Sequence, residues 1–183
     1  MRRIFALLLV VALIALLCGC QADTGEKSVY YRHADYPIYD TFNELFSQAT
    51  HVIYGRITDI SQEMLSYSIS HSELDKEPTT VYTVEILQHY KGEISSNIFY
   101  IRQFGGETDT AVYIYPDEPQ LVLGDNYILF LGGNCIDENT AWLLNAHQSV
   151  YLVSENKEII DVGGKGFPFS FSALPKPEDA GIE

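Results

Sequence analysis

Two short acidic segments hold the side chains that are best suited to binding a cation. Glu107 and Asp109 lie in GGETDT, and Asp117 and Glu118 lie in YPDEP. Carboxylates on flexible turns suit Ca²⁺, which takes about six to eight oxygen ligands, so a calcium site is expected if the two turns meet. The spacing matches no known calcium-binding loop such as the EF-hand, and this favours two solvated turns instead.

A hydrolase would need a nucleophile or a pair of catalytic acids, and the sequence offers one thiol. Cys135 follows Gly132, Gly133 and Asn134, which predict a turn, and His147 is the nearest histidine along the chain. A catalytic cysteine needs such a base, although a structural turn cysteine is the simpler interpretation. No two histidines are three or four residues apart, so the sequence holds no zinc signature, and it holds no Gly-x-Ser-x-Gly motif.

A third candidate site is a set of three side chains at alternate positions of one predicted strand. Tyr100, Arg102 and Phe104 would share one face of that strand, because successive side chains alternate between the two faces. Small barrels of the OB type bind ligands through exposed aromatics on such a face. Aromatic side chains also fill the cores of small barrels, and this second interpretation is favoured.

Short strands and turn glycines dominate the chain that must position these residues. Apolar alternation and β-branched residues predict strands over residues 51–60, 79–90, 96–104, 111–115, 126–133, 141–153 and 158–162. The strand at 141–153 is expected to be divided near Asn145, and Gly55 predicts a bulge inside the first strand. Residues 62–78 are polar and are expected to form a long surface loop, with a short hairpin as an alternative for part of it.

A single helix is predicted ahead of these strands, over residues 41–50. Thr41 can cap it, Glu44 completes a capping box, and Phe42, Leu45 and Phe46 form an apolar stripe at helical spacing. One short N-terminal helix followed by five to six strands with short turns predicts a mainly β fold, a small antiparallel OB-like barrel.

The core of the barrel is expected to form from strand faces with period-two alternation. Tyr82, Val84 and Ile86 share one face and are predicted to pack with Ile128 and Phe130. The predicted organisation is an export signal over 1–19, a tether over 20–35, the barrel over 36–163 and a Gly-, Pro- and Phe-containing acidic tail over 164–183.

The first residues have the pattern of an export signal. Arg2 and Arg3 precede fourteen apolar residues, 4–17, a run shorter than the roughly 20 residues that a membrane-spanning helix needs. The sequence LCGC that follows resembles the lipobox of bacterial lipoproteins. This resemblance implies a lipid on Cys20 as the first mature residue, whereas Cys18 would leave with the signal.

The charge of the mature chain excludes some partners. Loss of residues 1–19 leaves nine basic and 25 acidic residues, a formal charge of −16. Such a surface repels nucleic acid and anionic lipid, so we expect no nucleic-acid partner and attachment to the membrane only through Cys20. Cys135 is then the one remaining thiol, so the domain has no internal disulfide.

Four stretches resemble a family of small secreted bacterial proteins of unknown function: AxHVIYGRITDI, VYTVEILQHYKG, IFYIRQFGGE and LxxGDNYILFL. The layout is also similar to the netrin-like fold of tissue inhibitors of metalloproteinases, a five-stranded OB barrel. The resemblance covers roughly residues 49–131 and implies the fold much more than a function. Inhibition of metalloproteinases is not implied, because a lipid would occupy Cys20 and no disulfides would hold it near the barrel.

Two functions remain open after these considerations. The first is a lipid-anchored, extracytoplasmic module that binds a protein, peptide or glycan without catalysis, and the absence of a catalytic motif in the sequence favours it. The second is an extracytoplasmic hydrolase that uses the acidic turns or Cys135. A carboxyl or thiol with a base within hydrogen-bond reach would support the hydrolase.

Overall fold

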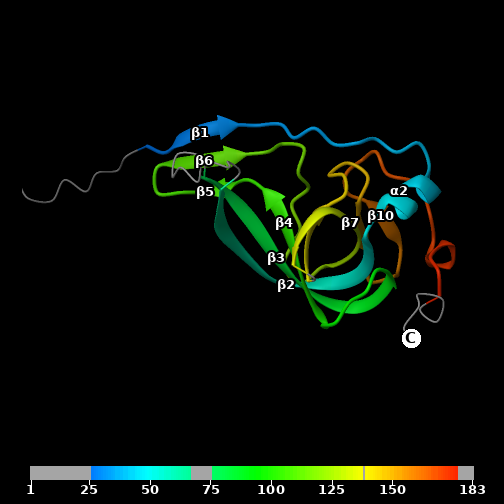
Figure 1. Ribbon diagram of the computed structural model, residues 1–183. Helices are drawn as coiled ribbons and strands as arrows, with labels where there is room; N and C mark the ends of the chain where they lie inside the picture. Colours follow the sequence, from blue (N-terminus) through cyan, green and yellow to red (C-terminus); the bar gives the residue numbers. More distant parts are fainter. Residues whose placement is uncertain (1–25, 67–75, 138, 177–183) are drawn as a thin grey trace, which may run out of the picture.

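Five strands of the protein follow one another around a ring. The computed structural model describes residues 26–66, 76–137 and 139–176. The ring contains β2 (His51–Ser66), β3 (Lys76–Lys91), β4 (Ile98–Phe104), β7 (Asn126–Asp137) and β8 (Thr140–Leu143). Their order is β2-β3-β4-β8-β7, and β7 pairs again with β2 (Figure 1).

This strand order matches the five-stranded Greek-key barrel of OB folds. The β4–β8 pair is parallel, and the other neighbours in the ring are antiparallel. The ring is only partly closed, because β7 pairs with β8 near Leu131 and Gly132 and then again at Asp137, with an irregularity between. The predicted mainly β, barrel-like fold with one short helix is therefore confirmed.

A glycine allows β2 to bend over β3. The pairing of the two strands shifts register between Tyr54 and Gly55, which confirms the predicted bulge. A Cβ atom on Gly55 would lie 2.4 Å from Cγ1 of Val84 and 2.8 Å from the carbonyl oxygen of Glu85. Only a residue without a side chain permits this approach of the two backbones.

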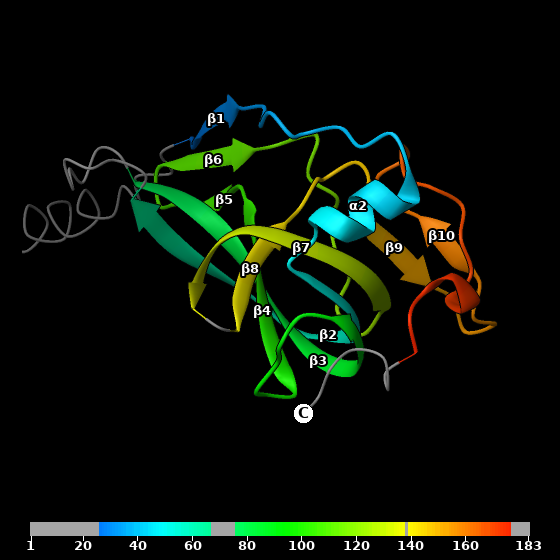
Figure 2. The same ribbon diagram turned by 45° about the vertical axis from the view of Figure 1, so that its right-hand side comes forward.

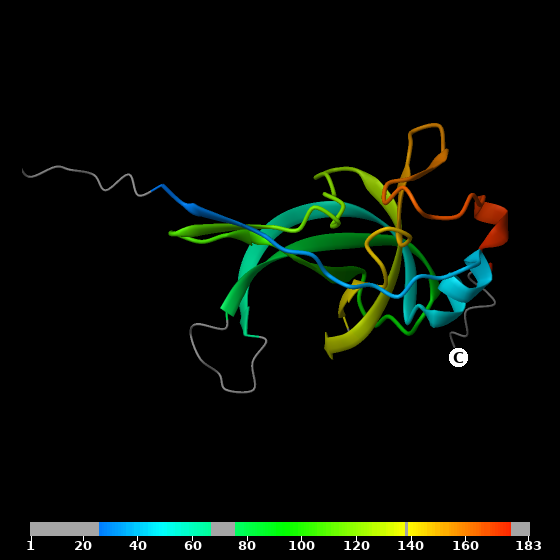
Figure 3. The ribbon, with the colours of Figure 1, turned by 90° about the horizontal axis from the view of Figure 1, so that it is seen from above.

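Additional strands extend the fold on two sides of the ring. β9 (Val150–Val153) and β10 (Ile159–Asp161) continue the main sheet beyond β7. A separate small sheet consists of β1 (Ser28–Tyr31), β6 (Ala111–Ile114) and β5 (Gly106–Glu107), in the order β1-β6-β5. Figure 3 shows this small sheet at the end of the molecule away from helix α2 (Phe42–Gln48).

Two backbone predictions differ from the structure. Residues 62–78 were expected to be a surface loop, with a short hairpin as the alternative, but β2 continues to Ser66 and pairs there with β3 from Lys76, so the hairpin arms are longer than expected and reach far beyond the ring. Their polar composition is explained by this extension, because the arms lie away from the barrel core. Cys135 was expected in a turn and instead lies within β7. Cys18 and Cys20 lie outside the described residues.

Two hydrophobic clusters lie on opposite faces of β7. The interior cluster of the barrel includes Tyr82 and Val84, with Ile86 packed at its edge, as predicted. The β7 residues in that cluster are Tyr127, Leu129 and Leu131 rather than the predicted Ile128 and Phe130. Both faces of β7 are buried, so its continuous apolar run carries no alternation from which the inward face could be predicted.

The outer cluster packs helix α2 against β7. Thr41 accepts a hydrogen bond from the Glu44 N–H at 3.1 Å, and the Glu44 carboxylate accepts from the Asp40 N–H at 2.9 Å. The predicted capping arrangement therefore forms, with its reciprocal bond one residue earlier than in a standard capping box. Leu45 is fully buried, and Phe42 and Phe46 meet Phe130 edge to face. Figure 2 shows helix α2 beside β7.

Both ends of the described chain contact the domain. Ser28–Tyr31, which the sequence analysis placed in the tether, pairs with β6 as strand β1. The predicted C-terminal tail contributes to the outer cluster: Phe167, Phe169, Phe171 and Leu174 pack there, the last two in and after a 3₁₀ turn, Phe171–Ala173.

Candidate functional site

A pocket of about 400 Å³ lies between the extended arms of β2 and β3, the corner where β4 leads to β5, and strand β6. Volumes of this size are typical of small-molecule sites. Four aromatic and two acidic side chains dominate its wall: Tyr82, Phe104, Tyr113, Tyr115, Glu107 and Glu118. The pocket wall is thus mixed, with aromatic rings beside acidic groups that lie at separate points of the wall.

A glycine at the end of β4 brings two walls of the pocket together. Gly105 has a φ of 102°, which favours glycine, and a Cβ atom there would lie 3.0 Å from the Tyr113 carbonyl oxygen. The chain can therefore turn sharply from β4 into β5, which pairs with β6 through Gly106 and Tyr113. Phe104 and Tyr113 consequently face the same pocket from different sheets.

Glu118 is an acid of the pocket wall whose pKa is strongly raised. Tyr36 donates a hydrogen bond to its Oε1 atom, while its Oε2 atom is buried and has no hydrogen-bond partner. Burial raises the pKa of Glu118 to about 7, the hydrogen bond from Tyr36 opposes this shift, and the negative charge of Asp117 adds to it. Burial beside Glu118 also raises the pKa of the Tyr36 hydroxyl.

Stacked rings fix the aromatic wall. Phe104 stacks on Tyr115 with ring centroids 5.3 Å apart and on Trp142 at 4.7 Å. The Tyr115 hydroxyl donates to Oε2 of Glu77 at 2.8 Å, and Arg32 lies 3.5 Å from the other oxygen of Glu77. These contacts hold the rings in place before any ligand arrives.

The predicted aromatic face forms, but only one of its members reaches the pocket. Tyr100, Arg102 and Phe104 share the outer face of β4, since the intervening residues point into the barrel. Phe104 lines the pocket, while Tyr100 is 42% exposed to solvent. Arg102 pairs instead with Glu63, its Nη2 atom 2.6 Å from a carboxylate oxygen.

The structure does not gather the four predicted metal ligands at one point. Among the described residues, which include all four acids, no group of three or more acidic, His or Cys side chains is placed to hold a metal ion. Glu107 pairs with Lys27, Asp117 lies 2.7 Å from Nδ1 of His33, and Asp109 is exposed. The acids are therefore divided among separate partners.

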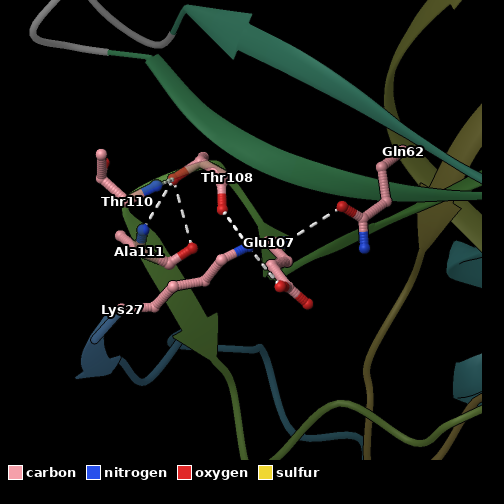
Figure 4. A network of polar contacts seen from close by, with 6 residues as sticks. All are labelled: Lys27, Gln62, Glu107, Thr108, Thr110 and Ala111. Atoms are coloured by element: carbon pink, nitrogen blue, oxygen red, sulfur yellow. Dashed lines mark hydrogen bonds and ion pairs between the residues drawn. The ribbon is translucent and has the colours of Figure 1, made fainter. Parts of the chain in front are cut away.

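A network around Lys27 ties the start of β1 to the pocket rim (Figure 4). The Lys27 ammonium donates to a Glu107 carboxylate oxygen at 2.5 Å and to the Thr108 carbonyl oxygen at 2.7 Å. The backbone N–H of Glu107 donates in turn to Oε1 of Gln62 on β2 at 3.0 Å. Three separate parts of the sequence are joined at this rim.

We call residues 26–40 the N-terminal strap, because they cross the domain from β1 to helix α2 (Figure 1). Near the end of the strap, the side chain of Gln148 donates to the Tyr39 carbonyl oxygen and accepts from the Tyr39 N–H, both at 3.0 Å. Asn145 donates to the Pro37 carbonyl oxygen. Both amide side chains are buried, so the strap is fixed where it meets the barrel.

Sequence reasoning missed Tyr36, Asn145 and Gln148 as parts of this arrangement. Tyr36 entered the prediction only as the first residue of the barrel domain, and Asn145 was interpreted as a break between strands. Buried amides that bind backbone groups leave no periodic signal in a sequence. Their partners lie more than 80 residues away along the chain, so only the tertiary structure pairs them.

No protein-family model matches the chain. No curated protein sequence matches it either. Among the described residues, no helix has the length and apolar character required to cross a bilayer. The function must therefore be inferred from the pocket itself.

Proposed function

We propose that this protein is a lipid-anchored, extracytoplasmic binding module whose ligand enters the pocket between β3, β4 and β6. The observation that carries the proposal is the combination of a preformed aromatic wall with a half-buried acid, Glu118, whose buried Oε2 atom has no hydrogen-bond partner among the described residues. Ligand pockets typically combine an apolar lining with a few placed polar groups.

The lipid anchor in this proposal rests on the lipobox resemblance at Cys20. Only five residues separate Cys20 from the first described residue, Glu26, and the strap then joins the barrel through β1 and Tyr39. Five extended residues span less than about 20 Å. The anchor would therefore hold the small sheet and its pocket close to the membrane surface.

The anchor is tested by metabolic labelling with a radioactive fatty acid. Cys20→Ser is expected to lose the label and to leave an unprocessed or released protein, whereas Cys18→Ser keeps the label. Label that persists in the Cys20→Ser protein would show that the anchor is assigned wrongly.

The pocket is tested by ligand-observed NMR of the full chain with a panel of small fragments. Gln120 lines the pocket and is exposed, so Gln120→Trp fills the entrance without disturbing the barrel core. Gln48→Trp is the matched control, because Gln48 is exposed on α2 and does not line the pocket. Fragments that bind the parent and Gln48→Trp but not Gln120→Trp would support the proposal, and equal binding to all three proteins would reject it.

The second candidate, an extracytoplasmic hydrolase, has one observation in its favour. A carboxyl whose pKa is about 7 can act as a general acid near neutral pH. The hydrogen-bond partner of Glu118, however, is the hydroxyl of Tyr36, whose pKa is raised, so Tyr36 does not serve as a base. Hydrolysis of glycosides or esters by the parent protein and its loss in Glu118→Gln would favour this candidate over the first.

A further inference from the structure

We infer that the pocket selects an organic cation, an amine or a quaternary ammonium group, with Glu118 as its counter-ion. This inference rests on the proposed function, because it names the ligand class of the same pocket. It depends on the charge of the wall, on the free oxygen of Glu118 and on the aromatic rings around it.

The charge of the wall excludes anionic ligands. Among the residues that the structure describes, the pocket is lined by two acids and by no Lys, Arg or His side chain. Glu107 is already neutralised by Lys27 at 2.5 Å. Glu118 receives a hydrogen bond from the neutral hydroxyl of Tyr36, which leaves its charge unopposed when it is ionised.

The free oxygen of Glu118 favours a ligand that carries a positive charge. Burial of an acceptor without a partner costs free energy, and the cost is larger for an ionised group. A neutral apolar ligand would leave the Oε2 atom as it is, whereas a cation would compensate the charge. Glu118 therefore discriminates between ligands of equal shape and different charge.

The aromatic wall adds to this preference. Tyr82, Phe104, Tyr113 and Tyr115 line the same space as Glu118. The faces of aromatic rings attract cations, and cages of such rings bind quaternary ammonium groups. Phe104 is covered by Tyr115 and Trp142, so a cation in this pocket would contact the tyrosine rings with its apolar substituents and would direct its charge to Glu118.

Binding is expected to depend on pH, because the cation favours the ionised form of Glu118. The titratable groups around this carboxyl are Tyr36, Tyr82, Tyr115 and Asp117. Burial raises the pKa of Tyr36 and of Tyr82, and the hydrogen bond from His33 lowers the pKa of Asp117. Between pH 6 and 8 Tyr36 and Tyr82 therefore stay protonated and Asp117 stays ionised, so affinity should rise as Glu118 loses its proton.

The test compares cationic probes with neutral molecules of the same shape by isothermal titration calorimetry of the full chain. Choline is paired with 3,3-dimethylbutan-1-ol, and pentylamine is paired with pentan-1-ol. At least one cation is expected to bind about tenfold or more tightly than its neutral counterpart, and more tightly at pH 8 than at pH 6. Glu118→Gln should remove both effects, while Glu155→Gln, which changes the same charge on an exposed turn, should keep them.

Two failures of this experiment have different meanings. In the first, cations and their neutral counterparts bind with equal affinity, while Gln120→Trp still loses fragment binding. This result would overturn the cation preference but would still support a binding pocket. A cation preference that survives in Glu118→Gln would overturn the role of Glu118. If no ligand loses affinity in Gln120→Trp, both the proposed function and this inference are overturned.

Discussion

The barrel and the N-terminal strap are held by different forces. The barrel interior is apolar, with Val84, Phe99 and Leu129 removed completely from solvent. The strap is held mostly by polar contacts, among them the Lys27–Glu107 ion pair and the Tyr36–Glu118 hydrogen bond. Burial of apolar surface dominates stability, whereas each exposed ion pair contributes little.

This difference separates stability from recognition within one small domain. Among the described residues, the interior cluster of the barrel contains no Asp, Glu, Lys, Arg or His side chain, so the core responds less to pH and salt than the strap does. His51 packs on Phe99 at the edge of this core, and burial lowers the pKa of that histidine. The contacts of the strap and the pocket depend on both pH and salt, because they involve the Lys27–Glu107 ion pair, the His33–Asp117 pair and the carboxyl of Glu118. Substitutions in the two regions should therefore differ in their effect on stability.

A charge in the barrel interior should abolish folding. Val84→Asp places a carboxylate without a partner among fully buried side chains. We expect the loss of most of the stability of the domain, which for such domains totals about 5–15 kcal/mol. Circular dichroism and urea denaturation measure it. Leu87→Asp on the same strand is the control, because Leu87 is exposed, and similar melting of Val84→Asp and the parent would refute the assigned face.

A cavity beneath helix α2, which follows the strap, should reduce the free energy of unfolding by less than Val84→Asp does. Leu45→Ala removes a fully buried side chain from the outer cluster, and such truncations cost about 2–5 kcal/mol. Ile38→Ala in the strap removes a side chain that is 76% exposed and should change stability by less than about 0.5 kcal/mol. Equal losses in the two variants, measured by chemical denaturation, would contradict the separation of barrel and strap.

Glu118 should make the stability of the protein fall between about pH 4.5 and 7. The folded state holds this proton more tightly than the unfolded chain, because the pKa rises from 4.5 to about 7 on burial. The stabilisation is therefore fully present below pH 4.5 and is lost as the pH rises through 7, by at most roughly 3 kcal/mol. Thermal melts across this range should show the decline, and Glu118→Gln should flatten it.

Asp117 supplies a control of opposite sign for that experiment. The hydrogen bond from His33 lowers the pKa of this exposed carboxyl, so its contribution is present above its unfolded pKa and is lost as the pH falls. Asp117→Asn should therefore alter the acid limb of the stability profile. It should reduce the decline between pH 4.5 and 7 without removing it, because burial is the main cause of the raised pKa of Glu118 and the Asp117 charge only adds to it. A decline between pH 4.5 and 7 that persists unchanged in Glu118→Gln would show that another group causes it.

The smallest effect is expected at the Lys27 network. Lys27→Met removes an exposed ion pair with Glu107 and should cost less than about 1 kcal/mol of global stability. The local effect should be larger, since Lys27 joins the start of β1 to the pocket rim. Hydrogen exchange of the β1 amides should accelerate at low salt, whereas Lys157→Met on the exposed turn after β9 should leave these amides unchanged.

Much of the fold could be predicted because local patterns determine it. Alternation in β3 identified the inward face at Tyr82 and Val84, and Thr41 with Glu44 identified the start of helix α2. Gly55 indicated the bulge that bends β2. In each case the residue types act on neighbours in the sequence or on one face of one element, and that information is present in a linear chain.

The inward face of β7 and the composition of the pocket were decided only in three dimensions. β7 is apolar on both faces, so the packing of α2 against Phe130 determines which residues point outward. Glu118 and Asp117 are adjacent in the sequence, yet one is buried against Tyr36 and the other pairs with His33. The sequence by itself determined that acids and aromatics are present, while long-range packing determined which acid is desolvated, because burial depends on segments that lie far apart along the chain.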